Sequence, residues 1–141
     1  MKKISVIYWS LSGHVKDMAI AVAKGIEENG GKAKLIEVDN AKIEDVINAD
    51  GIAFGSPSMD NNRIDQSHMQ PFISKFKGID VKDKKIVLFG SFGWDHGEFM
   101  EKWIKEMKDY DFDIIGSFCI KEAPNNQDLK ECEALGAKLA K

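Results

Sequence analysis

The sequence predicts a three-layer α/β sandwich in which helices cover both faces of a parallel sheet. Five short apolar runs alternate with segments whose apolar residues recur at helical spacing. Three of the runs, Ile4–Trp9, Gly51–Gly55 and Lys85–Ser91, are almost entirely apolar, which is typical of strands buried on both faces. Because strand–helix repeats of this length form right-handed crossovers, we expect the sheet to be doubly wound.

The two remaining runs complete a predicted sheet of five strands. The more charged run Ala33–Val38 suits an edge strand, and Asp113–Ile120 is the last strand along the chain. Helices are predicted at 13–29, after Asp39 or Asn40, from Gln70 onward, at 98–108 and from 126 to the end. This order of elements fits either half of a dinucleotide-binding fold or a sheet of strand order 2-1-3-4-5. In both arrangements, ligands bind at the carboxyl ends of the strands, near the point where the strand order reverses.

Length, charge and cysteine content narrow the function classes. The 141 residues fit one domain over 1–141, and a balance of 20 basic against 23 acidic residues argues against nucleic-acid binding. No run of about 18 apolar residues is present, so no membrane span is expected. The short apolar segment near the N-terminus is interpreted as a strand rather than a signal peptide. Cys119 and Cys132 lack metal-ligand spacing, and we expect a cytoplasmic protein.

The segment after the first strand favours an anion site. Ser10 and Ser12 supply hydroxyl groups, Gly13 allows close approach of the backbone, and the following helix supplies amides and a favourable dipole. The segment matches neither the Walker pattern nor the dinucleotide fingerprint. The same two serines would equally serve as helix caps, so this segment alone leaves both interpretations open.

Two further loops follow the third and fourth predicted strands. Segment 55–72 is a long polar loop with Met59 near its start, and a loop of this length inside a compact domain is usually functional. Segment 90–99 presents Trp94 between glycines, where stacking on a planar ring explains the tryptophan better than core packing. A flat aromatic ligand with a monophosphate tail would satisfy all three loops.

At these residues the sequence resembles the short-chain flavodoxin family, most closely the clostridial type. The likeness covers almost the whole chain and rests on "VIYWSLSGH", "GSPSM", "PFI" and "KKIVLFGSFGWDHGEFM". The resemblance implies a flavodoxin-like parallel sheet of order 2-1-3-4-5 and non-covalent binding of FMN. It implies a one-electron carrier between redox partner proteins rather than a hydrolase or transferase, and no nucleophile–base pair or pair of carboxylates argues for hydrolysis.

The resemblance also implies a place for each part of FMN. Met59 would cover the inner face of the isoalloxazine, the Met59–Asp60 peptide would meet N5, and Trp94 would stack on the outer face. The backbone of residues 91–93 would contact the pyrimidine edge. The phosphate would be surrounded by Ser10, Ser12, Gly13 and His14. The predicted cofactor-binding residues are Ser10, Leu11, Ser12, Gly13, His14, Val15, Ser58, Met59, Asp60, Asn61, Ser91, Phe92, Gly93, Trp94, His96 and Gly97.

Two positions and the overall charge depart from the family pattern. Val15 stands where the family usually has a hydroxyl-bearing threonine, so we expect Val15→Thr to tighten FMN binding. Asp60 stands where the family commonly has glycine, and aspartate adopts a positive φ less readily than glycine. The net charge of −3 is also small for a family whose members are typically strongly acidic.

The histidines support an alternative ligand. All three, His14, His68 and His96, fall in the predicted site loops, and histidine is a common axial ligand of haem iron. The alternative is therefore a flavodoxin-fold protein that binds haem or a related tetrapyrrole for trafficking or reduction. A third interpretation is an interaction protein with an empty site. The spacing of the histidines argues against a separate metal site. We expect a monomer, with a ligand-dependent dimer as the alternative.

Overall fold

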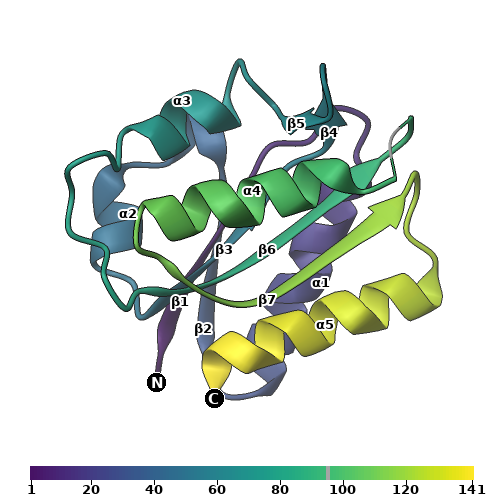
Figure 1. Ribbon diagram of the computed structural model, residues 1–141. Helices are drawn as coiled ribbons and strands as arrows, with labels where there is room; N and C mark the ends of the chain where they lie inside the picture. The colour runs from purple at the N-terminus through teal and green to yellow at the C-terminus, as the bar shows by residue number, and fades with distance from the viewer. Residues whose placement is uncertain (95) are drawn as a thin grey trace.

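The computed structural model describes residues 1–94 and 96–141; Asp95, in the predicted loop 90–99, lies outside the described residues. The main sheet consists of five parallel strands in the order β2-β1-β3-β6-β7 (Figure 1). These strands are β1 (Lys3–Tyr8), β2 (Lys32–Glu37), β3 (Gly51–Gly55), β6 (Lys85–Phe92) and β7 (Asp113–Lys121). Counted within this sheet alone, this is the predicted order 2-1-3-4-5, so the predicted fold class is confirmed.

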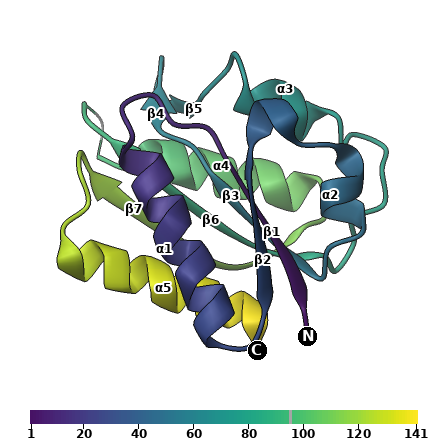
Figure 2. The same cartoon turned by 180° about the vertical axis from the view of Figure 1, so that it is seen from behind.

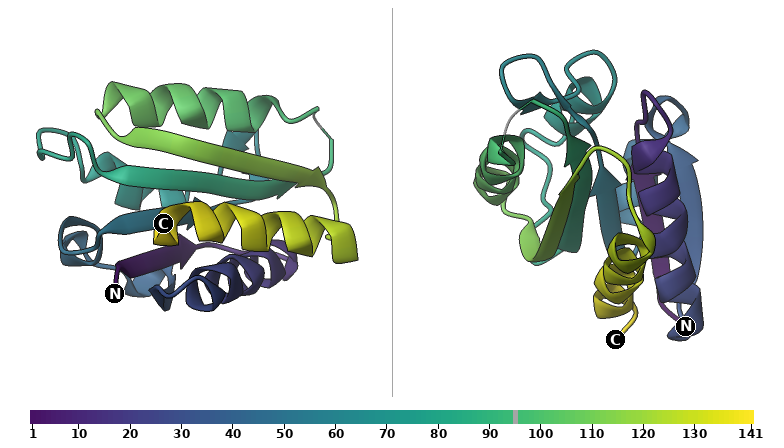
Figure 3. Two further views of the ribbon diagram at one scale, coloured as in Figure 1. Left: turned by 90° about the horizontal axis from the view of Figure 1, so that it is seen from below. Right: turned by 90° about the vertical axis from the view of Figure 1, so that its right-hand side faces the viewer.

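Helices cover both faces of this sheet and enclose two separate cores (Figures 2 and 3). On one face lie α1 (His14–Glu28) and α5 (Asn126–Ala140). On the other lie α2 (Ile43–Ile47), α3 (Met69–Ser74) and α4 (Glu98–Asp109), and a 3₁₀ turn at Val38–Asn40 precedes α2. The central strand β3 is buried along its whole length, as its uninterrupted apolar sequence predicts.

Two glycines allow α1 and α5 to approach closely. A Cβ atom on Gly25 would lie 1.9 Å from the carbonyl oxygen of Glu133, and one on Gly136 would lie 2.1 Å from that of Val22. Any larger residue at either position would therefore force the two helices apart. This contact fixes α1, and with it the first loop, against the sheet.

The second predicted loop contains an element that the sequence did not indicate. Within segment 55–72, β4 (Ser58–Met59) pairs antiparallel with β5 (Arg63–Ile64). Asn61 and Asn62 form the turn, with φ angles of 60° and 56°. Strands of two residues are too short to produce a detectable alternation of apolar and polar residues, but asparagine is the residue that most readily adopts positive φ after glycine.

No helix in the described part of the chain has the length and apolarity needed to cross a membrane. This finding agrees with the absence of a long apolar run in the sequence.

Candidate functional site

The three predicted loops lie at one edge of the sheet. They follow β1, β3 and β6, which are neighbours in the sheet and run parallel, so their carboxyl ends lie side by side (Figure 1). Hydrogen bonds continue the ladder beyond the strands: the Trp9 amide donates to the Gly55 carbonyl at 3.0 Å, and the Ser56 amide to the Phe89 carbonyl at 3.2 Å. The starts of the first two loops are therefore anchored to their neighbouring strands.

Ser10 organises the first loop. Its Oγ accepts hydrogen bonds from the amides of Gly13 at 3.1 Å and Lys16 at 3.2 Å. Gly13 precedes α1 with a φ angle of 96°, a left-handed conformation that suits glycine. Because glycine has no side chain, it does not cap the first amides of the helix. Within the described residues, the amides of His14 and Val15 have no hydrogen-bond acceptor. The serine therefore does more than cap the helix: it shapes a loop that leaves helix amides available to an anion.

The other side chains of the first loop differ in exposure. Val15 is only 1% exposed and packs in the core beneath α1, so at this position only the backbone faces the loop. Leu11 and Ser12 are exposed, and His14 is half-buried with its Nδ1 3.4 Å from Ser12 Oγ. Contacts from Val15 to a ligand would therefore come from its amide.

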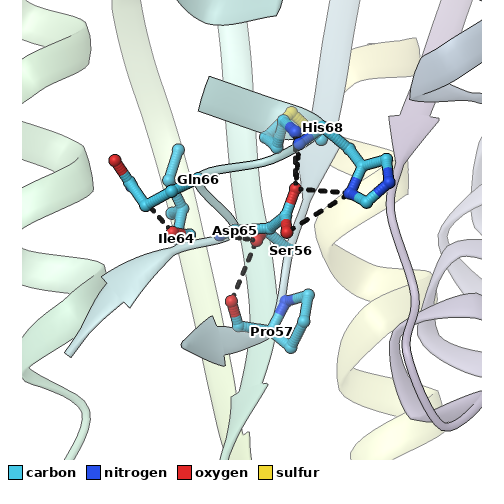
Figure 4. A network of polar contacts seen from close by, with 7 residues as sticks. Ser56, Pro57, Ile64, Asp65, Gln66 and His68 are labelled. Atoms are coloured by element: carbon cyan, nitrogen blue, oxygen red, sulfur yellow. Dashed lines mark hydrogen bonds and ion pairs between the residues drawn. The ribbon is translucent and has the colours of Figure 1, made fainter. Parts of the chain in front are cut away.

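A buried polar network shapes the second loop (Figure 4). Ser56 Oγ donates to the Pro57 carbonyl at 2.9 Å and accepts from the Asp65 amide at 2.9 Å. The Asp65 carboxylate, in a residue only 3% exposed, accepts from the amides of His68 at 2.6 Å and Met69 at 2.8 Å. Sequence reasoning missed Ser56 and Asp65. An aspartate a few residues before a helix start is a recognised capping signal and would have pointed to Asp65.

Two cationic side chains hold the turn of the hairpin. Arg63 Nε donates to the Asp60 carbonyl at 3.2 Å, and Lys102 Nζ of α4 donates to the Asn61 carbonyl at 2.9 Å. The turn is closed by the Asn62 amide, which donates to the Met59 carbonyl at 3.1 Å. Within this turn, Asn61 and Asn62 have positive φ angles and Asp60 does not, so Asp60 carries no strain of the kind that a glycine would relieve.

The third loop displays its tryptophan to solvent. Trp94 is 100% exposed, whereas Ser91 is buried and Phe92 is half-buried at the end of β6. Gly97 directly precedes α4 and has a φ angle of 90°. The exposed His96 donates its amide to Glu98 Oε2 at 2.5 Å, and this hydrogen bond holds the pKa of the Glu98 carboxyl below its usual range. A fully exposed indole is available for stacking on a planar ring.

The three histidines have separate surroundings. His14 contacts Ser12, His68 lies against Asp65 and the ring of Trp9, and His96 is exposed. Over residues 1–94 and 96–141, no group of three or more histidine, cysteine, aspartate or glutamate side chains could hold a metal ion.

A cleft of about 320 Å³ lies far from these loops, at the amino ends of β1 and β2. Its lining includes Lys34 and Asp45, whose side chains pair with each other at 3.1 Å. Since ligands of doubly wound sheets bind at the carboxyl ends of the strands, the three-loop edge is the better candidate.

Comparison with known proteins identifies the family. The flavodoxin family model matches residues 6–136 of the chain. The chain belongs to the flavodoxin family. It is 30% identical to the flavodoxin of Megasphaera elsdenii over 138 residues, which are 98% of both chains. It is 29% identical to the flavodoxin of Clostridium beijerinckii over 137 residues, 97% of this chain and 99% of the relative.

A solved structure agrees with this assignment. The structure of an archaeal flavodoxin superposes with a TM-score of 0.90 at 28% identity, covering 98% of this chain and 96% of the other. The predicted family, including its short-chain type, is confirmed by relatives of nearly equal length. The haem alternative receives no support from the family or from these relatives.

Proposed function

We propose that this flavodoxin binds FMN at the three-loop edge and carries single electrons between redox partner proteins. The observation that carries the proposal is that helix amides with no acceptor among the described residues and a fully exposed tryptophan both lie at the same edge of the sheet. The amides suit a phosphate, and the indole suits a planar ring. Membership of the flavodoxin family supports FMN as the ligand that combines the two.

The phosphate of FMN would be held mainly by backbone. The amides of His14 and Val15, which have no acceptor among the described residues, would bind it, while Ser10 keeps the loop in shape and Ser12 adds an exposed hydroxyl. Because the phosphate would lie at the start of α1, the helix dipole also favours its negative charge. A side-chain hydroxyl at position 15 is not needed for this arrangement.

The ring would lie between the second and third loops. Met59 and Trp94 would cover its two faces, and the backbone of residues 91–93 would meet its edge. The bound flavin supplies the one-electron redox chemistry, and the protein supplies orientation and a local environment of low polarity. The turn at Asp60 and Asn61 is held by Arg63 and Lys102, so its polar groups would meet the ring in a defined arrangement.

FMN titration of the apoprotein tests the proposal. We expect binding at submicromolar concentration with quenching of flavin fluorescence. We also expect Trp94→Ala to weaken binding about 5- to 20-fold through loss of stacking and apolar contact. Leu35→Ala, which removes another exposed apolar side chain on the distant edge strand β2, should leave the affinity unchanged. Absence of FMN binding at micromolar concentration would refute the proposal.

Electron transfer itself is tested by reducing the FMN complex and mixing it with an oxidised one-electron acceptor such as a c-type cytochrome. Transfer should require the bound flavin and be absent in the apoprotein. We further propose a cytoplasmic monomer, which sedimentation of the FMN complex would distinguish from a dimer.

A further inference from the structure

The imidazole of His68 is fixed by a buried carboxylate. Asp65 accepts from the backbone amide of His68 at 2.6 Å, and its Oδ2 lies 3.2 Å from His68 Nδ1. Figure 4 shows that the carboxylate lies between the backbone and the ring of the same histidine. Because Asp65 is also bonded through its own amide to the fully buried Ser56, this carboxylate has little freedom to move. Both the position and the ring orientation of His68 therefore depend on Asp65.

The ring of His68 stacks on Trp9, which belongs to a different loop. The ring centroids are 4.7 Å apart and the planes meet at 14°. Trp9 is half-buried, packs against the core on the side of α2, α3 and α4, and donates its amide to Gly55. The indole is thus held between the core and the imidazole.

Trp9 directly precedes Ser10, which shapes the first loop, between β1 and α1. This loop is called the anion loop below. Ser10 Oγ accepts from the amides of Gly13 and Lys16, so the place of this oxygen sets the course of the loop. The orientation of Trp9 sets where the chain enters Ser10. A continuous series of contacts therefore runs from Asp65 through His68 and Trp9 to the anion loop.

We propose that His68 is a positioning residue for the phosphate end of the site: by stacking on Trp9 it holds the first loop in its anion-binding shape. The proposal rests on the proposed FMN function, and His68 itself need not touch the ligand. It assigns a role to a histidine that the sequence singled out only as an axial-ligand candidate for haem. Under this proposal the second loop, which would hold the flavin ring, also supports the first loop, which would hold the phosphate.

A purely structural role for His68 would give a different pattern of ligand affinities. General loosening of the domain would weaken FMN and riboflavin equally, because both share the ring. Positioning of the anion loop affects only the ligand that carries a phosphate. The ratio of FMN affinity to riboflavin affinity therefore separates the two roles.

The test compares four proteins: wild type, His68→Ala, His68→Phe and the neighbouring exposed control Ser67→Ala. We expect His68→Ala to lower the FMN-to-riboflavin affinity ratio about 3- to 10-fold, the size of effect that loss of an aromatic stack produces. His68→Phe retains a planar ring and should restore most of the ratio, whereas Ser67→Ala should leave it unchanged. An unchanged ratio in His68→Ala, or equal loss of both ligands, would overturn the proposal.

A second readout does not depend on flavin. In the apoprotein, amide hydrogen exchange at Gly13 and Lys16 should accelerate several-fold in His68→Ala and not in Ser67→Ala, because these amides bond to Ser10 Oγ. If wild type bound no flavin while this acceleration occurred, the FMN function would fail and the positioning role would stand. If wild type bound FMN and exchange were unchanged in His68→Ala, the positioning role would fail alone.

Discussion

Removal of the Asp65 carboxylate should destabilise the fold more than removal of any exposed aspartate. Asp65 is 3% exposed, and its carboxylate accepts from the amides of His68 and Met69 at 2.6 and 2.8 Å. In Asp65→Ala both amides lose their acceptor, and Met69 is fully buried, so water cannot replace it. A buried amide left unsatisfied costs about 1–3 kcal/mol, and loss of a helix-capping bond costs about 1 kcal/mol.

These contributions together predict a loss of about 2–4 kcal/mol in the free energy of unfolding. For a domain of this size the corresponding fall in Tm is roughly 7–13 °C. Asp65→Asn retains one carbonyl oxygen as acceptor, so we expect about half this loss.

Urea unfolding followed by circular dichroism measures the effect, with Asp80→Ala as the matched control. Asp80 also accepts a backbone amide, that of Lys82 at 3.0 Å, but it is exposed, so water can take its place. We expect Asp80→Ala to cost less than about 1 kcal/mol. A loss below 1 kcal/mol in Asp65→Ala would show that the network in Figure 4 does not hold the second loop.

Three further predictions concern other parts of the molecule. Gly136→Ala should lower the free energy of unfolding by about 3 kcal/mol or more in the same assay, because its Cβ would lie 2.1 Å from the Val22 carbonyl oxygen; a change below 1 kcal/mol would contradict this packing. Burial, with the nearby carboxylates of Asp128, Glu131 and Glu133, raises the pKa of the Cys132 thiol from 9.0 to about 12. The unfolded chain then loses this proton first, so the free energy of unfolding should fall from about pH 9 toward pH 12. Replacement of Cys132 by alanine should reduce that slope. Val15→Thr should cost about 1–2 kcal/mol because it buries a hydroxyl in the α1 core. Tighter FMN binding in this variant, as the sequence pattern alone suggested, would show that the threonine reaches the anion loop.

The fold could be predicted from the sequence because each strand of the main sheet has its own local signal. The apolar runs of β1, β3 and β6 and the charged run of β2 distinguish central strands from the edge, and the predicted bounds of the five strands differ from the observed ones by at most one residue. The hairpin β4–β5 was missed because pairs of two residues carry no periodicity. One of the contacts that hold its turn comes from a side chain distant in sequence, Lys102.

The candidate site was predicted in part. The loops that contain Ser10, Met59 and Trp94 do follow neighbouring strands, as a doubly wound sheet requires. The roles of individual residues within these loops could not be predicted from the sequence. Ser10 bonds to the backbone of its own loop and Val15 points into the core, facts that depend on how the chain turns into α1.

The sequence by itself determined the layered fold, the family and the edge of the sheet where a ligand would bind, because these depend on local periodicity and on short contiguous motifs. The tertiary structure decided which polar groups at that edge are available and which are already used. Asp65, Ser56 and His68 form a network only because the second loop folds back on the end of β3, and His68 meets Trp9 only because β1 and β3 are neighbours. Contacts between residues 59 positions apart leave no pattern in one sequence, and their energies depend on burial that only the packed chain creates.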